Sequence, residues 1–554
     1  MKIISVLGFL VILFTNVLFA SPGDSVDVTI RDVQNAGVFG QRLYVDSLDQ
    51  FHFIYCRNQQ WIWNFRDTNG VYIGGWGYTP FTGGGVNIDV TRDAEPHWQR
   101  SAVGYHFNTG SNGYFPFFDI DVYNGSGSWP NDPRTPGHNN WLWPYVACVN
   151  NGNIIMAMDD NAGSYHHVVT TTDMGTTWIN ELTYDSSAII TRFLRSSNNH
   201  GSNRVVFVRT QFITDSAAAG QLDQDLYYTL STDGGVTWGQ QTNITGYLPT
   251  DSVRGYVGLS AVFDLNDKLH IVWEGRHVDN GQYLDESKIF HWDEVTNTIS
   301  VVSGPNPLFP GGWWGWSTHE FGVWRLPADE PQLIIDRSTG WLYCLWHGQT
   351  DTTDHSFSGW PNGDFYGAYS TDGGLTWGAY GSAYGYVNLT NTHTSGGLPG
   401  FCEDEDYMTA NPFTFHDSIV VTYIEDKDAG SFIYSEGDTT NNPVRIWVFH
   451  KSLISGPSTI GENKVVKPNR LFMNISPIPA SDQVEISFFI PGPGNVSLKL
   501  YSLDGRFVKD IESGYKKAGA YRIFISTHGL TNGNYFIVLS AGNGKIRRNI
   551  IVVH

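Results

Sequence analysis

The sequence predicts an all-β protein: a β-propeller, with seven blades favoured and six as the alternative, followed by a small antiparallel β-sandwich. Three observations lead to this prediction. A pair of apolar strands joined by a polar turn returns along the chain, a short turn containing Asp and Trp occurs three times, and the balance of charge changes sign near residue 460. Aromatic residues make up 14% of the 554 residues and charged residues only 16%, which suits many short strands joined by glycine-rich turns.

The first twenty residues predict a secretory signal peptide. Lys2 is followed by a long apolar run that ends at Ala20 and Ser21, which is the order found in leaders that are removed on export. A retained membrane anchor is the alternative, because the run is nearly long enough to span a bilayer. No cysteine follows the run, which argues against a lipoprotein, and no later segment is expected to cross a membrane as a helix.

Residues 26–456 repeat one template: an apolar strand, a turn with Asp or Asn, and a second apolar strand that ends in a polar residue. The period is about 50–75 residues, which predicts propeller blades of four strands each. The strand at 419–424 is apolar at nearly every position, as a strand buried on both faces requires. The early strand at 26–30 is expected to pair into the last blade and close the ring, which removes open sheet edges. Clear second strands lie at 51–57, 154–159, 269–274, 341–347 and 419–425, and weaker copies surround 101–121 and 192–210.

The three short turns span residues 171–178, 231–238 and 370–377 and share the pattern Ser/Thr-x-Asp-x-Gly-x-Thr-Trp. The Asp carboxylate can accept backbone N–H bonds within a tight turn. The Gly permits a positive φ, and the Trp ring can pack over the turn. We expect each copy to close a β-hairpin, with structural roles for Asp173, Gly175, Trp178, Asp233, Gly235, Trp238, Asp372, Gly374 and Trp377.

This turn pattern resembles the Asp-box, or BNR repeat, of sialidase-like β-propellers. The resemblance implies that the boxes lie on the face away from the active site and have a structural role. Sialidases also carry a Phe/Tyr-Arg-Ile-Pro motif in the first blade, and the nearest echo here is Trp324-Arg325-Leu326-Pro327, far along the chain. Their Glu-Gly-Arg segment is matched by Glu274-Gly275-Arg276, but no box follows it. No catalytic triad is therefore transferred from the family.

The face opposite the boxes is expected to collect the ends of the second strands and the connections between blades. Carboxylates, arginines and tryptophans around a central funnel suit a polar, ring-shaped ligand such as a glycan. If hydrolysis occurs, a carboxylate pair is the expected machinery, and the candidates are Glu274, Asp404 and Glu425. The candidate ligand-binding residues are Arg57, Asp159, Arg209, Arg254, Tyr256, Arg276, Trp313, Trp314, His347 and Tyr407.

Several of these features have a second interpretation. The acidic run from Glu403 to Asp406 is expected to be a solvated loop, with calcium binding as the alternative, because no ligand spacing is fixed. Trp313 and Trp314 either plug the funnel or bind a sugar. No cofactor and no metal site are expected. The cysteines Cys56, Cys148, Cys344 and Cys402 are expected to be buried free thiols, with one bridge as the alternative in a secreted chain.

The C-terminal part predicts a separate small unit at 469–554, after a polar linker at 457–468. Strands alternate with Asp-Gly and Asn-Gly turns, which predicts an antiparallel sandwich. From Glu462 onward there are 12 basic and six acidic residues, although the whole chain has a net charge of −21. This change in charge marks a domain boundary.

The C-terminal unit resembles the type A (Por) C-terminal sorting domain of the type IX secretion system. The matching motifs are Leu-Tyr-x-Leu-x-Gly-Arg at 500–506, Ala-Gly-x-Tyr at 518–521, Gly-x-Tyr-Phe at 533–536 and a basic-then-apolar end at 547–553. One departure is Ser-Pro-Ile-Pro at 476–479, where the family usually has Pro-Asn-Pro. The resemblance implies export across both membranes and then surface attachment or release. An appended carbohydrate-binding sandwich is the alternative.

We therefore expect a secreted or cell-surface propeller that binds extracellular glycan or protein through the face opposite the boxes. One alternative is a sialidase-like glycoside hydrolase or lyase acting on extracellular polysaccharide, and another is a structural envelope protein. The missing arginine motif favours binding. The expected partners are a glycan or surface protein and the type IX machinery, whereas the net charge of −21 disfavours nucleic acid and anionic lipid.

Overall fold

The structure is a computed structural model of the chain, and it divides into two compact units, Met1–Pro457 and Ser458–His554. The predicted signal peptide and the predicted linker at 457–468 lie outside the described residues, so the domain limits stay predictions. The structure describes residues 21–34, 40–58, 60–68, 70–78, 86–92, 99–108, 113–129, 134–138, 140–160, 165–185, 191–213, 223–304, 312–315, 321–351, 353–456, 472–476, 480, 483–490, 492–503, 505–517, 519–542 and 544–553.

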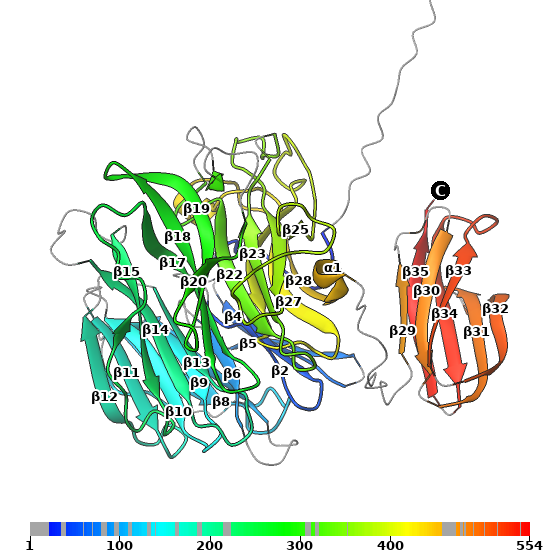
Figure 1. Ribbon diagram of the computed structural model, residues 1–554. Helices are drawn as coiled ribbons and strands as arrows, with labels where there is room; N and C mark the ends of the chain where they lie inside the picture. Colours follow the sequence, from blue (N-terminus) through cyan, green and yellow to red (C-terminus); the bar gives the residue numbers. More distant parts are fainter. Residues whose placement is uncertain are drawn as a thin grey trace, which may run out of the picture. The chain divides into compact units, whose positions relative to one another are not determined.

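Within these residues, the first unit contains seven antiparallel blades (Figure 1). A single bridge between Gln224 and Gly255 joins the fourth blade to the fifth, and the short β21 (Trp314–Gly315) pairs with the fifth. The first three blades are β2 (Leu43–Val45), β3 (Phe51–Arg57), β4 (Gln60–Arg66) and β5 (Tyr72–Tyr78); β6 (Asn87–Val90), β7 (Ser101–Asn108) and β8 (Tyr114–Ile120); and β9 (Trp141–Cys148), β10 (Ile154–Asp160), β11 (Tyr165–Thr171) and β12 (Ile179–Asp185).

The remaining four blades follow the same order, from the inner strand outward. They are β13 (Arg192–Ser196), β14 (Val205–Phe212), β15 (Gln224–Ser231) and β16 (Thr242–Asn243); β17 (Val253–Phe263), β18 (Leu269–Asp279), β19 (Gln282–Asp293) and β20 (Ile299–Val301); β22 (Ala328–Ile335), β23 (Leu342–Gly348), β24 (Asp364–Ser370) and β25 (Val387–Asn388); and β26 (Asp404–Ala410), β27 (Ser418–Asp426), β28 (Asn442–His450) and β1 (Asp24–Thr29).

The seven blades form a closed ring. Each inner strand contacts the next in the order β2, β6, β9, β13, β17, β22 and β26, and β26 contacts β2 again. The predicted propeller is therefore confirmed, with seven blades. The N-terminal strand β1 pairs with β28 at the outer edge of the last blade, from Asp24 opposite Ile446 to Thr29 opposite Asn442, as the early apolar strand predicted.

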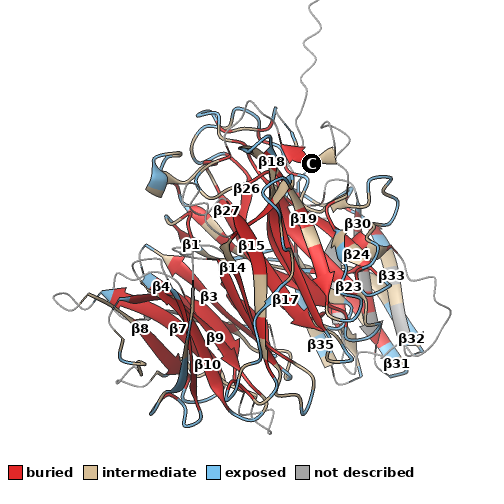
Figure 2. Ribbon diagram, turned by 60° about the vertical axis from the view of Figure 1, so that its left-hand side comes forward, coloured by how far each residue is buried: buried red, intermediate tan, exposed pale blue. Residues whose placement is uncertain are grey.

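Burial on both faces explains the apolar strands. All but the first residue of β27 are buried, and the blades are buried along most of their length in Figure 2. Each inner strand also turns an unpaired edge toward its neighbour, where a buried N–H needs an acceptor. The Met408 N–H of β26 donates to Glu330 Oε2 of β22 at 3.0 Å, and the Leu333 N–H of β22 donates to Ser260 Oγ of β17 at 3.1 Å. Side chains of the preceding blade thus supply hydrogen-bond acceptors for N–H groups on this edge.

The three repeated turns each close the hairpin between the third and fourth strands of a blade. Their Asp carboxylates accept the N–H of the following Thr at 2.8 Å for Asp173, 2.8 Å for Asp233 and 3.0 Å for Asp372. The Ser or Thr that opens each turn accepts the N–H of the Gly at 2.8, 2.9 and 2.8 Å. The three turns therefore share one set of hydrogen bonds, at one end of the blades.

The turn glycines also press against the preceding blade. Gly175, Gly235 and Gly374 have φ angles of 86°, 81° and 87°. A Cβ at Gly235 would lie 2.6 Å from Ile155, and one at Gly374 would lie 2.0 Å from His291. Both the positive φ and the close approach require glycine. Trp178 packs edge-on against Phe118 of the preceding blade, Trp238 packs against the core, and Trp377 donates its indole N–H to Ser300 at 3.1 Å.

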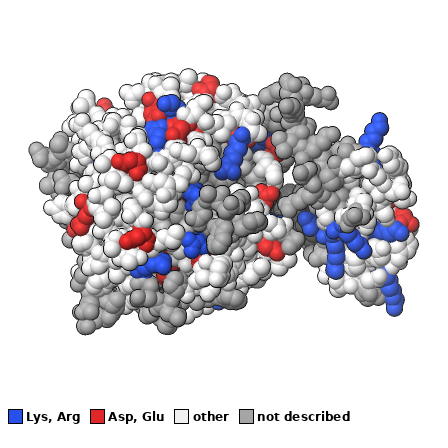
Figure 3. Space-filling model, turned by 90° about the horizontal axis from the view of Figure 1, so that it is seen from below, with Lys and Arg blue, Asp and Glu red and all other residues white. Residues whose placement is uncertain are grey.

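The second unit is an antiparallel sandwich of two sheets around its own apolar core, as predicted. Lys and Arg gather on the face of this unit that Figure 3 shows, whereas the propeller face carries both signs of charge. The sheets are β29 (Phe472–Ser476), β30 (Gln483–Ile490) and β33 (Gly519–Ser526), and β31 (Gly494–Ser502), β32 (Phe507–Lys516), β34 (Gly533–Ala541) and β35 (Gly544–Val552).

The four cysteines are buried free thiols, as expected. The described helices are short: α1 (Ser452–Ser455) and a 3-10 turn at Phe432–Tyr434. In the described part of the chain, no helix has the length and apolar character needed to cross a membrane.

Candidate functional site

A small pocket that opens to solvent lies between the sixth and seventh blades. Strands β23 and β27 end here and β26 begins here, whereas the turn of the sixth blade lies beyond the opposite end of β24, so the pocket is on the face opposite the repeated turns. Its aromatic walls are Phe321, Trp360 and Tyr407. Its charged lining residues are Asp32, Arg325, Asp404, Asp406, Asp426 and Glu436.

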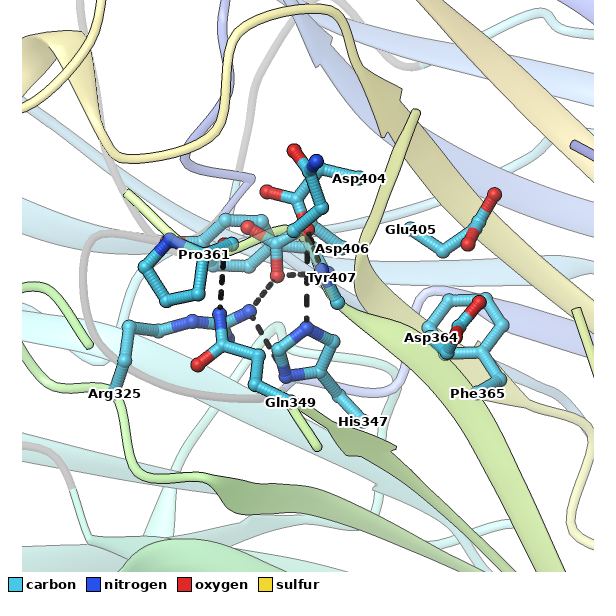
Figure 4. A network of polar contacts seen from close by, with 12 residues as sticks. Arg325, His347, Gln349, Pro361, Asp364, Phe365, Asp404, Glu405, Asp406 and Tyr407 are labelled. Atoms are coloured by element: carbon cyan, nitrogen blue, oxygen red, sulfur yellow. Dashed lines mark hydrogen bonds and ion pairs between the residues drawn. The ribbon is translucent and has the colours of Figure 1, made fainter. Parts of the chain in front are cut away.

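Alternation along β26 brings the carboxyl groups together. Asp404 and Asp406 line the pocket, and Asp404 lies directly opposite Asp426 of β27. Cβ atoms of such cross-strand pairs are about 5 Å apart. Figure 4 shows Glu405 on the other side of β26, toward Asp364. The chain then bulges between Asp406 and Thr409, with Tyr407 at a φ of 52°. Such strained positions in non-glycine residues cluster at functional sites.

Arg325 is the centre of the polar network beside the pocket (Figure 4). It pairs with Glu330 at 2.6 Å and with Asp406, and its Nη2 lies 3.3 Å from His347 Nδ1. His347 in turn pairs with the buried Asp329 at 2.7 Å, and its Nε2 is 4.0 Å from Asp404 Oδ1. The guanidinium is therefore fully engaged by groups of the protein.

The surroundings of two of the pocket's carboxyl groups raise their pKa. Burial, and then the charge of Asp406, raise the pKa of Asp404 to about 7. Burial, and then the charge of Asp404, raise the pKa of Asp426 well above its usual range. Asp406 instead accepts hydrogen bonds from Arg325 and from the Tyr407 N–H, the latter at 2.8 Å. The pocket thus places two carboxyl groups of raised pKa beside one that is paired with an arginine.

Three of the residues predicted from the sequence meet at this pocket: Asp404 and Tyr407 line it, and His347 contacts Asp404. The other two catalytic candidates lie elsewhere. Glu425 is buried in ion pairs with Lys427 and Arg445. Glu274 is fully buried in the fifth blade, where its Oε1 accepts the Val257 N–H at 3.0 Å.

The remaining ligand-binding candidates are distributed over other blades. Trp314 is fully buried and packs against Trp346 and Tyr366, whereas Trp313 stacks on His277 at a ring distance of 4.3 Å. Each charged candidate has a partner nearby: Arg57 with Asp27, Asp159 with His166 and Arg192, Arg209 with Gln241, Arg254 with Asp223, and Arg276 with Asp285 and the ring of the buried Tyr256.

One expectation of the sequence needs correction. The acidic run from Glu403 to Asp406 is buried, and from Asp404 onward it forms the start of β26 rather than a solvated loop. Asp406 and Asp426 were therefore missed, together with Arg325. The overlooked signal is that Asp404 and Asp406 alternate within the first residues of an inner strand. In the described part of the chain, no group of three or more His, Cys, Asp or Glu side chains is arranged to hold a metal ion.

Comparison with known proteins identifies the second unit. Residues 474–553 match the family model of the secretion system C-terminal sorting domain. This domain directs export by type IX secretion to the cell surface or beyond, through contact with the secretion machinery. No curated protein matches the chain by sequence.

Several solved structures are similar to the chain at low identity. The polysaccharide lyase Uly1 is 11% identical with a TM-score of 0.45, over 79% of this chain and 100% of that one. A PL25 ulvan lyase bound to -[GlcA(1-4)Rha3S]- is 11% identical with a TM-score of 0.46, over 78% and 95%. The GH93 α-L-arabinofuranosidase of Fusarium graminearum is 10% identical with a TM-score of 0.39, over 78% and 99%.

Proposed function

We propose that the propeller is an extracellular glycoside hydrolase that cleaves glycans lacking an acidic group at the cleavage site. The observation that carries this proposal is that one pocket is lined by Asp404, whose pKa is raised to about 7, and by Asp406, which is paired with Arg325. Two carboxyl groups in different environments are the usual acid and base of glycoside hydrolysis. The repeated turns, which we propose to be Asp-boxes, lie on the far face and take no part.

Asp404 is the general acid of this proposal. A proton donor works best when its pKa is near the working pH, and the pKa of Asp404 is about 7. Its Oδ1 accepts the Gly363 N–H at 2.6 Å, which leaves Oδ2 to carry the proton to the glycosidic oxygen. Burial, and then the charge of Asp404, raise the pKa of Asp426 well above its usual range, so Asp426 keeps its proton beside the acid.

Asp406 is the second carboxyl group of this proposal. Arg325 forms an ion pair with it and fixes its position. From there it can activate a water molecule or stabilise positive charge at the anomeric carbon. Arg325 pairs with Asp406, and His347 lies 4.0 Å from Asp404, so we assign both as positioning residues for the two carboxyl groups.

The charge of the pocket argues for uncharged substrates. Five carboxyl groups and one arginine line it, and that arginine is already engaged by Glu330 and Asp406. Among the described lining residues, no cation without a carboxylate partner remains to receive the carboxylate of a sialic acid or uronic acid. Uncharged sugar rings can instead stack on Trp360. This selectivity disfavours the sialidase and uronate-lyase alternatives.

The test is release of reducing ends from a panel of polysaccharides. We expect turnover of at least one neutral polymer, such as an arabinan, xylan or glucan, and none of polygalacturonate or polysialic acid. Asp404→Asn should lower the rate by roughly 10²- to 10⁴-fold. Asp372→Asn, the same change on the opposite face, should leave the rate unchanged at 25 °C. Binding of a neutral glycan without release of reducing ends would refute hydrolysis and support glycan binding alone.

A further inference from the structure

Ser21 lies buried in the last blade and is bonded to a carboxylate. Its side chain is 4% exposed, and its Oγ donates to Glu405 Oε1 at 2.5 Å. The next two residues are also anchored there. The Pro22 carbonyl accepts from the Tyr423 hydroxyl, and the Gly23 carbonyl accepts from Arg445 at 2.9 Å. The chain just before β1 is therefore held in a defined position against β26 and β27.

Glu405 is a buried carboxylate whose described partners are hydroxyl groups. Thr392 donates to its Oε2 at 2.9 Å, opposite the bond from Ser21. Burial, and then the charges of Asp364 and Asp404, raise its pKa well above the usual range. Glu405 also lies opposite Glu425 of β27, whose carboxylate is already paired with Lys427 and Arg445. Among the residues that the structure describes, no cation forms an ion pair with Glu405. A positive charge beside this buried group would favour its ionised form.

We propose that the chain is cleaved between Ala20 and Ser21 and that the new α-ammonium group of Ser21 forms a buried ion pair with Glu405. Hydrolysis of this peptide bond by a peptidase consumes one water. It leaves a carboxylate on Ala20 and an amine on Ser21 that takes up a proton at neutral pH.

The geometry supplies the contact. The nitrogen and Oγ of one serine are separated by three bonds and thus lie about 3 Å apart. With Oγ at 2.5 Å from Glu405, the nitrogen is within about 6 Å of the same carboxylate, a range in which opposite charges favour ionisation. In the uncleaved chain this nitrogen is a neutral amide and cannot supply the charge.

Cleavage would then strengthen the wall of the pocket. Glu405 lies between Asp404 and Asp406 on β26, on the side away from the pocket. An ion pair there holds the strand from behind, so the mature N-terminus completes the structure that carries both pocket carboxylates. The inference needs no assumption about what the pocket binds, and its test uses no substrate.

The experiment compares two forms of the chain from Ser21 to His554: one with a free Ser21 amine and one with Gly-Ser added before it. We expect the free form to melt about 5 °C higher at pH 7, given the usual cost of breaking a buried ion pair. Glu405→Gln should abolish this difference. Glu274→Gln, which changes another buried carboxyl in a different blade, should preserve it.

A second measurement covers the case in which Glu405→Gln does not fold. The Ser21 amine of the free form should resist an amine-acylating reagent until the protein unfolds, as read by mass spectrometry. N-terminal sequencing of exported protein should begin at Ser21. Equal melting temperatures of the two forms, a Ser21 amine labelled as fast as in the unfolded chain, or a mature chain that begins at another residue would each overturn the proposal.

Discussion

Three successive residues of β26 show how one chemical group acquires three roles. Asp404 is buried beside other acids and has a pKa raised to about 7, whereas Asp406 forms an ion pair with Arg325. Glu405 points away from both, toward Ser21. The side chains are nearly identical, so the strand alternation and the neighbouring charges determine their chemistry.

The raised pKa of Asp404 predicts a specific dependence of stability on pH. Asp404 and Glu330 both have a pKa of about 7 in the folded chain, against about 4 when unfolded. The folded chain therefore binds more protons between about pH 4 and 7, and the free energy of unfolding falls as pH rises through that window. Asp404→Asn should make this fall shallower in urea denaturation series. An unchanged slope would contradict the raised pKa.

At the scale of the element, the repeated turn stabilises the contact between neighbouring blades. Its Asp and hydroxyl bonds fix the backbone, and its second glycine lets that backbone touch the preceding blade. Met174 occupies the left-handed position that glycine takes in the other two turns, with a φ of 57°. In the third blade this side chain finds room beside Arg100, whose guanidinium lies 3.5 Å from the Met174 Sδ, whereas a Cβ at the equivalent Gly234 would lie 2.4 Å from Asn151.

Two glycines of the repeated turns allow the cost of a positive φ to be measured apart from the cost of a steric contact. Gly235→Ala brings a Cβ to 2.6 Å from Ile155 at a φ of 81°, whereas Gly373→Ala has a similar φ of 73° and no atom within 4 Å. We expect Gly373→Ala to cost about 1 kcal/mol of unfolding free energy and Gly235→Ala at least about 2 kcal/mol. Chemical denaturation of both variants checks this. Equal losses would show that the turn does not press on the neighbouring blade.

The extent to which the sequence predicted the fold and the site also differs by element. Strands buried on both faces must be apolar throughout, so the template at 419–424 and its copies predicted the blades. The pocket could not be predicted from the sequence because its contacts join segments that are distant along the chain. Asp406 meets Arg325 of the sixth blade, and Asp404 meets Asp426 across a ladder. An isolated acidic run gives no sign of such partners. For Trp314 the sequence left a plug of the funnel and a sugar contact both open, and the structure places it in the core.

At the scale of the whole molecule, the ring depends on a strand from the other end of the chain. β1 covers the outer edge of β28 and so leaves no open edge on the last blade. The same segment carries Ser21 to Glu405. Closure of the propeller and support of the pocket therefore use one stretch of about ten residues.

Removal of residues 21–30 should open the ring. We expect the shortened chain to lose a single cooperative thermal transition and to associate through the exposed edge of β28, because an unpaired strand edge recruits other strands. Calorimetry and light scattering measure both effects. Removal of residues 457–554 is the control: the second unit has its own core, so the melting temperature of the propeller should stay the same. A shortened chain that remains monomeric and cooperative would contradict this account of closure.

The most direct test of the central claim is the pH dependence of kcat/KM on a neutral polysaccharide. Because the acid must be protonated, we predict that kcat/KM falls tenfold per pH unit above about pH 7, where Asp404 loses its proton. Asp404→Asn should remove both the activity and this limb of the profile. A rate that is unchanged up to pH 9, or an Asp404→Asn variant with the same profile as the native chain, would contradict the assignment of Asp404 as the acid.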